Sequence, residues 1–125
     1  MKFQPDFLDG VNTIARHDRG GLWVGTQAHA GSVVVPWSGA VRAWPPRHFD
    51  ELTQDHFDGL LSDNPELVIF GSGERLRFPK PALLRSLIER HIGCETMDTA
   101  AACRTYNVLV SEGRNVVAAL LFDAS

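Results

Sequence analysis

Apolar positions divide the 125-residue chain into parts with different periodicities. Residues 11–49 contain short β-branched and aromatic runs that glycine and proline interrupt, which is typical of short strands. Residues 50–125 alternate between helically spaced apolar positions and continuous apolar runs. Residues 1–10 fit neither pattern, and we interpret them as an N-terminal extension.

A β-hairpin is expected at the start of the β-rich part. Residues 11–16 and 22–26 are rich in β-branched and apolar side chains, and Gly20 and Gly21 lie between them. Further strands are expected at 31–35 and 41–44, since proline follows each run.

The remainder of the chain predicts alternating helices and strands. The first helix should be capped by Thr53 and ended by Asn64-Pro65, and a strand should follow at 67–70. A second helix should start at Pro81, with a strand after it at 94–97. A third helix should run from Asp98 or Thr99 to about Val110 or Ser111, and the last strand should span 116–122. Strands separated by helices form parallel sheets. The pattern therefore predicts one α/β domain over residues 1–125, with a mixed, mostly parallel sheet and an added β-hairpin layer.

Helical spacing also predicts which side chains face the core. The second helix should bury Leu83, Leu84, Leu87 and Ile88, and Gly93 should supply its left-handed terminus. The third helix should bury one apolar face, formed by Ala102, Cys103, Tyr106, Leu109 and Val110.

Composition excludes several classes of protein. The formal charge of −3 at pH 7 argues against general nucleic-acid binding through electrostatics. No apolar run approaches the roughly 20 residues that span a bilayer, and residues 1–6 lack the apolar core of a secretory signal. With two cysteines, which provide no disulfide framework, these features predict a cytoplasmic, soluble protein.

Glycines follow the strand at 67–70, where α/β sheets commonly bind ligands. Gly71, Ser72 and Gly73 could bring backbone N–H groups close to a phosphate or carboxylate, and Arg75 could add positive charge. The third glycine of a dinucleotide fingerprint and the Lys-Ser/Thr of a P-loop are both missing. A tight turn after the strand is therefore the simpler interpretation.

Asp98 and Thr99 follow the next strand, and a parallel arrangement would place them beside the glycine loop. Asp before a run of alanines is typical of a helix cap, and capping alone explains these residues. If a pocket forms there, Asp98, Thr99 and Asn107 would be its polar lining and Arg104 its positive charge. Arg104 and Asn107 equally fit the solvated face of a helix.

Catalytic and metal-binding signals are weak. Cys103 lies near a helix start but points toward the apolar face, which favours a buried structural thiol over a nucleophile. The histidines lack an H-E-x-x-H or C-x-x-C context, so we expect neither a metal site nor a cofactor.

Three ordered motifs resemble a known family. They are V-x-x-G-x-G from Val68, D-T-x-x-A-C-x-T-Y-N-x-L from Asp98, and E-G-R from Glu112. This set resembles the small α/β domain of mitochondrial complex I assembly factor 3 and its uncharacterised bacterial relatives. The matched positions of special interest are Gly71, Gly73, Asp98, Thr99, Cys103, Asn107, Gly113 and Arg114.

The resemblance implies a three-layer α/β fold around a mixed sheet. It also implies a non-enzymatic role in the assembly of the respiratory NADH dehydrogenase at a membrane, with protein partners. It supplies no catalytic residues, and a shared fold does not fix a shared task.

Three functions remain open from the sequence. We favour a non-enzymatic interaction or assembly protein with protein partners, peripheral at a membrane and without nucleic acid. The second is a binder of a small anion at Gly71–Gly73, Asp98, Thr99 and Arg104. The third is an enzyme at the same edge that uses Asp98 or Cys103.

Overall fold

A five-stranded mixed sheet forms the centre of the molecule. The computed structural model describes residues 10–122, and the interpretation of residues 1–9 as an extension lies outside them. The strand order is β5-β4-β8-β6-β7. The bounds of these strands are Val33–Pro36 for β4, Arg42–Ala43 for β5, Leu67–Gly71 for β6, Gly93–Met97 for β7 and Val116–Leu120 for β8.

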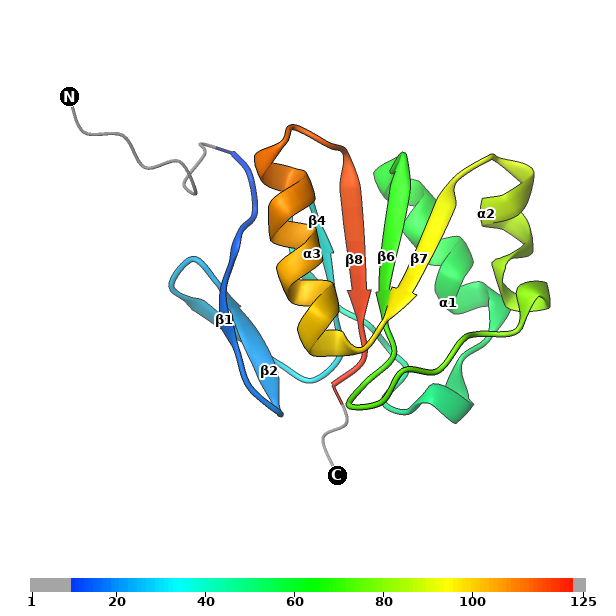
Figure 1. Cartoon of the computed structure of the whole chain (residues 1–125), viewed down its shortest axis with the longest axis horizontal. Helices are drawn as coiled ribbons and strands as arrows, with labels where there is room; N and C mark the ends of the chain where they lie inside the picture. Colours follow the sequence, from blue (N-terminus) through cyan, green and yellow to red (C-terminus); the bar gives the residue numbers. More distant parts are fainter. Residues whose placement is uncertain (1–9, 123–125) are drawn as a thin grey trace.

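Helices cover both faces of this sheet (Figure 1). Strand β6 is parallel to β7 and β8, and β4 is antiparallel to β8, so the predicted mixed, mostly parallel core is confirmed. The chain passes from β6 to β7 through α2 (Arg85–Glu89) on one face, and from β7 to β8 through α3 (Thr99–Ser111) on the other. Helix α1 (Gln54–Asp58) lies on the α2 face. Short 3-10 helices complete the connections at Phe49–Glu51, Gly59–Asp63 and Pro81–Leu84.

The sheet separates two apolar cores. Along β8 every residue is buried, because alternate side chains pack against α3 and against the α1–α2 layer. Val116, Ala118 and Leu120 join Tyr106 on the α3 side. On the other side Phe57 and Phe70 pack edge to face with ring centroids 5.5 Å apart. The continuous apolar run predicted to lie deep in the sheet is therefore confirmed.

The predicted hairpin is part of a second, three-stranded antiparallel sheet, in the order β1-β2-β3. Strand β1 spans Ile14–His17, β2 spans Gly21–Val24 and β3 spans Gln27–Ala30. The sequence pattern did not predict β3, because its side chains are mostly exposed and none is β-branched or aromatic apart from His29. Backbone pairing with β2 holds it at the sheet edge.

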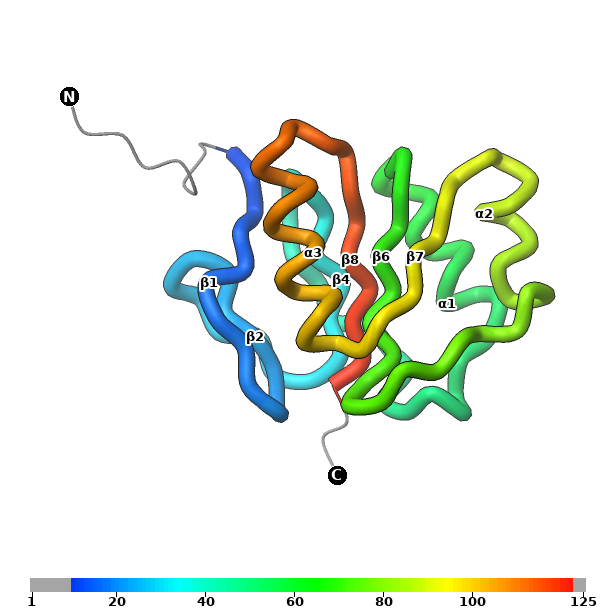
Figure 2. The backbone as a smooth tube through the Cα atoms, in the orientation of Figure 1, coloured from blue at the N-terminus to red at the C-terminus, as the bar shows by residue number. Residues whose placement is uncertain are grey.

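Side chains of α3 attach the second sheet to the main one, and Figure 2 shows β1 running beside α3. The Asn107 side-chain amide donates to the Ile14 carbonyl at 2.8 Å, and its oxygen accepts from the Ile14 N–H at 2.9 Å. The Tyr106 hydroxyl lies 2.9 Å from the Asn12 carbonyl and 3.0 Å from that of Pro36. Asn107 therefore acts as an additional strand partner for β1.

Two details of the predicted second helix are wrong. Ile88 is 58% exposed, whereas Leu87 is buried. The element begins as a 3-10 helix, and this tighter winding shifts the apolar stripe around the axis. The left-handed residue after α2 is His91, with φ of 59°, and Gly93 instead begins β7.

Within residues 10–122, the structure contains no helix of the length and hydropathy needed to cross a bilayer.

Replacing Asn107 with alanine should weaken the attachment of β1. The variant loses both hydrogen bonds to Ile14, so we expect the free energy of unfolding to fall by about 1–3 kcal/mol. Urea denaturation followed by circular dichroism measures this change. The neighbouring Val108→Ala variant, at a position 55% exposed, should stay within about 0.5 kcal/mol of the parent. Equal stabilities of the two variants would contradict the assignment.

Candidate functional site

The carboxyl ends of β6, β7 and β8 meet at one edge of the sheet, as the sequence predicts for β6 and β7. The Ser72 N–H donates to the Met97 carbonyl at 2.9 Å, and the Thr99 N–H donates to the Gly73 carbonyl at 2.9 Å. The Leu121 N–H, just beyond β8, donates to the Gly71 carbonyl at 3.0 Å. The three strand ends are thus joined by backbone hydrogen bonds.

The Thr99 hydroxyl lies at the centre of this junction. It donates to the Leu121 carbonyl at 2.8 Å and accepts from the Gly73 N–H at 2.8 Å. Thr99 is buried, so both bonds are shielded from water. One side chain from the start of α3 therefore connects the loops that follow β6 and β8.

The fold itself requires glycine at both positions of this loop, Gly71 and Gly73. A Cβ atom on Gly71 would lie 2.9 Å from the Thr99 Oγ1 and 3.0 Å from its Cα, so a side chain there would displace α3. Gly73 has a φ of 104°, a conformation that other residues rarely adopt. The spacing of the G-x-G motif follows from the close approach of Thr99 and from this backbone turn.

Asp98 caps α3, as predicted. Its carboxylate accepts from the Ala101 N–H at 2.9 Å. The backbone donors predicted to cradle an anion are also in use, since the Gly73 and Ser72 N–H groups bond to Thr99 and Met97. At this edge the protein's own hydroxyl occupies the place that a phosphate oxygen would take.

A polar hollow of about 360 Å³ opens beside the glycine loop. Arg75, Ser72 and Gly73 line it together with a segment the sequence analysis did not connect to the site, residues 47–50. Its complete lining is Arg47, His48, Phe49, Asp50, Ser72, Gly73, Glu74, Arg75, Arg77 and Leu121. Arg47 was missed because it follows two prolines in an irregular segment, and only the tertiary fold brings it to this hollow.

Ion pairs neutralise both carboxylates of the hollow. Asp50 lies 3.3 Å from the Arg77 guanidinium, and Glu74 lies 2.8 Å from that of Arg19. Arg47 and Arg75 make no ion pair among the described residues. The hollow therefore presents positive charge to solvent.

A second hollow, of about 350 Å³, lies between the β1–β2 turn and the start of α3. Its lining residues are His17, Asp18, Arg19, Glu74, Thr99, Ala100, Leu121 and Phe122. The Arg19–Glu74 ion pair connects the hairpin to the loop after β6 at this point.

Three predicted pocket residues do not line the hollows. Asp98 caps α3 and lines neither of them. Asn107 uses its amide group to hold β1, and Arg104 is exposed on α3. Neither residue lines either hollow. The structure thus brings together Gly71, Ser72, Gly73, Arg75, Asp98 and Thr99, but not Arg104 or Asn107.

Both cysteines are poor nucleophiles. Cys103 is buried as predicted, and burial raises the pKa of its thiol to about 12, although the Arg104 charge partly opposes this shift. Burial, aided by the Glu95 carboxylate, raises the pKa of the Cys94 thiol to about 12. Within residues 10–122, no group of three or more His, Cys, Asp or Glu side chains is placed to hold a metal ion.

Replacing Thr99 with valine should destabilise the protein strongly. The variant keeps the side-chain shape but leaves the Gly73 N–H and the Leu121 carbonyl without their shared partner, at a cost of about 2–4 kcal/mol. Thr99→Ser keeps the hydroxyl and should lose about 1 kcal/mol, for the missing methyl group. Urea denaturation compares the two, and a serine variant as unstable as the valine variant would refute the role of the hydroxyl.

Cys103 should resist alkylation in the folded protein. Its raised pKa keeps the thiol protonated as pH rises from about 7 to 9, whereas an unfolded thiol ionises near pH 8.5. We therefore expect iodoacetamide labelling of Cys103 to stay slow over this range and to accelerate in urea. Peptide mass mapping measures each rate. Fast labelling of the folded chain at pH 8 would show an accessible thiolate.

Curated relatives include an assembly factor for a respiratory enzyme. The bovine (Bos taurus) NADH dehydrogenase [ubiquinone] 1 alpha subcomplex assembly factor 3 is 32% identical over 105 residues, which are 82% of this chain and 56% of that protein. The chain therefore spans little more than half the length of this relative.

Solved structures share the fold. A Bordetella pertussis protein described as an Mth938-like domain superposes with a TM-score of 0.85 at 29% identity, covering 100% of this chain and 94% of that one. A Bartonella henselae protein described as an outer membrane protein gives a TM-score of 0.77 at 34% identity, covering 90% and 96%. The family model described as "protein of unknown function (DUF498/DUF598)" matches residues 14–121, and the chain belongs to this family.

Proposed function

We propose that this protein is a non-enzymatic, protein-binding factor that assists the assembly of a respiratory membrane complex, with a membrane-bound NADH dehydrogenase as the first candidate. The observation that carries this proposal is the relationship to the bovine NADH dehydrogenase assembly factor over 82% of the chain. The family match spans residues 14–121, which contain all five strands of the main sheet. The shared part therefore includes the whole main sheet rather than a short motif.

The chemistry of the sheet edge supports a role without catalysis. The thiols of Cys94 and Cys103 are protonated at neutral pH, because burial raises both pKa values to about 12. The Thr99 hydroxyl and the Asp98 carboxylate, which the sequence singles out at this edge, bond to backbone groups of the protein itself. These bonds give both side chains a structural role in the fold.

A small anion is the second candidate ligand, favoured by one observation. The Arg47 and Arg75 side chains line the polar hollow and make no ion pair among the described residues. Such a ligand would use the two guanidinium groups instead of the backbone N–H groups of Ser72 and Gly73. One protein can both assist assembly and bind an anion. An anion site alone, however, does not account for the relationship to the bovine assembly factor.

The proposal places the protein in the cytoplasm, in contact with a membrane complex. Two findings bear on this proposed location. No described helix could span a bilayer, and the Bartonella henselae relative is described as an outer membrane protein. Cell fractionation in the native organism distinguishes a cytoplasmic or peripheral pool from an outer-membrane pool.

Purification of the tagged protein from gently solubilised native cells should enrich subunits of a membrane-bound NADH dehydrogenase, relative to cells that express the tag alone. Mass spectrometry identifies the co-purified proteins. Deletion of the gene should lower the amount of assembled complex on native gels, and expression of the chain should restore it. Normal assembly in the deletion strain, together with a preparation free of respiratory subunits, would refute the proposal.

A further inference from the structure

One segment of the surface combines positive charge with exposed apolar side chains. Residues 75–88 contain four of the twelve cationic side chains of the chain and none of its fifteen acidic ones. The same segment carries three of the five exposed large apolar side chains described: Leu76 at 54%, Phe78 at 69% and Ile88 at 58%. A basic segment with protruding apolar side chains is typical of proteins that bind at a membrane surface.

Residues 75–80, which we call the basic loop, lie at the surface, and all of them except Pro79 are exposed. The Arg77 guanidinium stacks on the Phe49 ring, 4.2 Å from its centroid. Leu76, Phe78 and Lys80 are exposed. Two apolar side chains and an ammonium group therefore project from the outer side of the loop.

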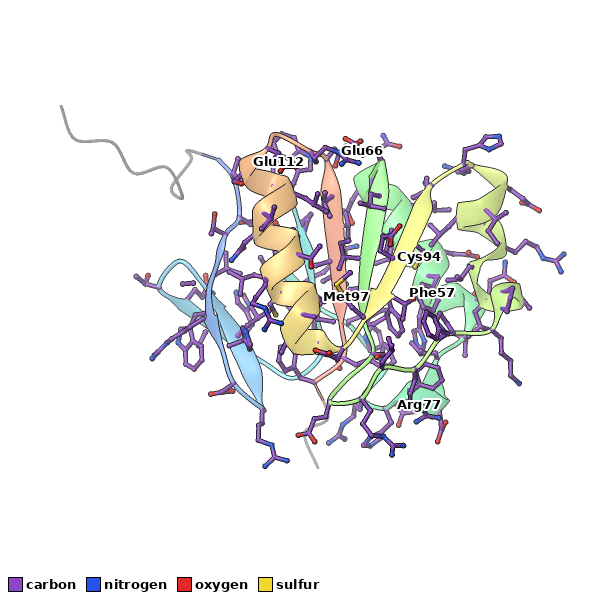
Figure 3. The ribbon with its side chains drawn as sticks, viewed as in Figure 1. Phe57, Glu66, Arg77, Cys94, Met97 and Glu112 are labelled. Atoms are coloured by element: carbon purple, nitrogen blue, oxygen red, sulfur yellow. The ribbon has the colours of Figure 1, made fainter. Side chains whose placement is uncertain are left out.

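Hydrogen bonds hold the basic loop in this conformation. The buried Ser72 hydroxyl donates to the Arg75 carbonyl at 2.6 Å and accepts from the Arg77 N–H at 3.1 Å. The Arg77 side chain also pairs with Asp50 at 3.3 Å. Figure 3 shows Arg77 at the margin of the molecule, beyond the end of the main sheet. The apolar side chains are thus presented by an anchored loop at the surface.

The charge around the loop is positive. Asp50 and Glu74, the carboxylates that line the hollow, are paired with Arg77 and Arg19, and Glu51 accepts from the Arg47 N–H at 2.9 Å. No ion pair among the described residues involves four other cations of this region, which are Arg47, Arg75, Lys80 and Arg85. A negatively charged surface would be attracted here, although the net charge of the chain is −3.

We propose that the basic loop docks the protein on an anionic phospholipid bilayer, with Leu76 and Phe78 inserted at the interface and the surrounding cations on lipid phosphates. The shape of this surface favours a bilayer over an acidic protein as the binding partner of the basic loop. Leu76 and Phe78 project singly from a loop, and the hollow beside them is lined by arginines and carboxylates. A bilayer accepts protruding side chains without a complementary pocket, whereas a protein interface needs a packed apolar centre. This inference stands independently of the proposed assembly function.

Co-sedimentation with protein-free vesicles tests the docking surface. We expect the full chain to bind vesicles of phosphatidylcholine containing about 30% phosphatidylglycerol, and to bind pure phosphatidylcholine at least about tenfold more weakly. Leu76→Ser/Phe78→Ser and Lys80→Glu/Arg85→Glu should each reduce the affinity for the anionic vesicles about tenfold or more. Rising salt should weaken binding by the parent.

Matched controls test whether vesicle binding depends on the basic loop rather than on any exposed apolar side chain or any cation. Val108→Ser removes an apolar side chain 55% exposed on α3, and Arg16→Glu reverses a cation on β1, so both should bind like the parent. Circular dichroism verifies that every variant is folded.

Several outcomes would overturn the proposal. One is equal affinity for neutral and anionic vesicles, and another is unchanged binding by the Leu76→Ser/Phe78→Ser variant. Displacement by millimolar inorganic phosphate, with that serine variant still binding like the parent, would identify a small-anion site. Binding to polyglutamate without binding to vesicles would identify an acidic protein as the partner. Because the vesicles contain no protein, each of these results leaves the assembly function untouched.

Discussion

The architecture depends on one buried hydroxyl group. Thr99 begins α3 directly after β7, and its Oγ1 bonds to the Gly73 N–H beyond β6 and to the Leu121 carbonyl beyond β8. Parallel strands have no short connections to fix their ends, since each crossover passes over a face of the sheet. The threonine supplies this missing connection. Gly71 exists as glycine because the helix must approach closely enough for the bonds to form.

The same junction occupies backbone groups that commonly bind ligands at this location of an α/β sheet. In open α/β sheets, N–H groups at the carboxyl ends of the strands commonly hold phosphates. Here Met97 and Thr99 already bond to those of Ser72 and Gly73. Arg47 and Arg75 line the hollow beside this edge, and neither makes an ion pair among the described residues.

Polar and apolar contacts join the small sheet to the main one. Asn107 and Tyr106 extend from α3 to β1 and to the segment before it, so the small sheet is held by buried polar contacts as well as by Ile14 and Leu22. The second anchor is the Arg19–Glu74 ion pair between the hairpin and the loop after β6. Because this pair is exposed, it contributes little to stability.

The sequence by itself determined the order of elements from β6 to β8, the buried strands and the Asp98 cap, because periodicity and capping are local properties of the chain. It also identified Gly71 and Thr99 as positions of interest. Tertiary structure alone decided their roles, since the bonds between Gly73, Thr99 and Leu121 join residues distant in sequence. For the same reason it decided that Asn107 holds β1, that β3 pairs at an exposed edge, and that Arg47 lies in the hollow beside Arg75. No local pattern encodes such contacts.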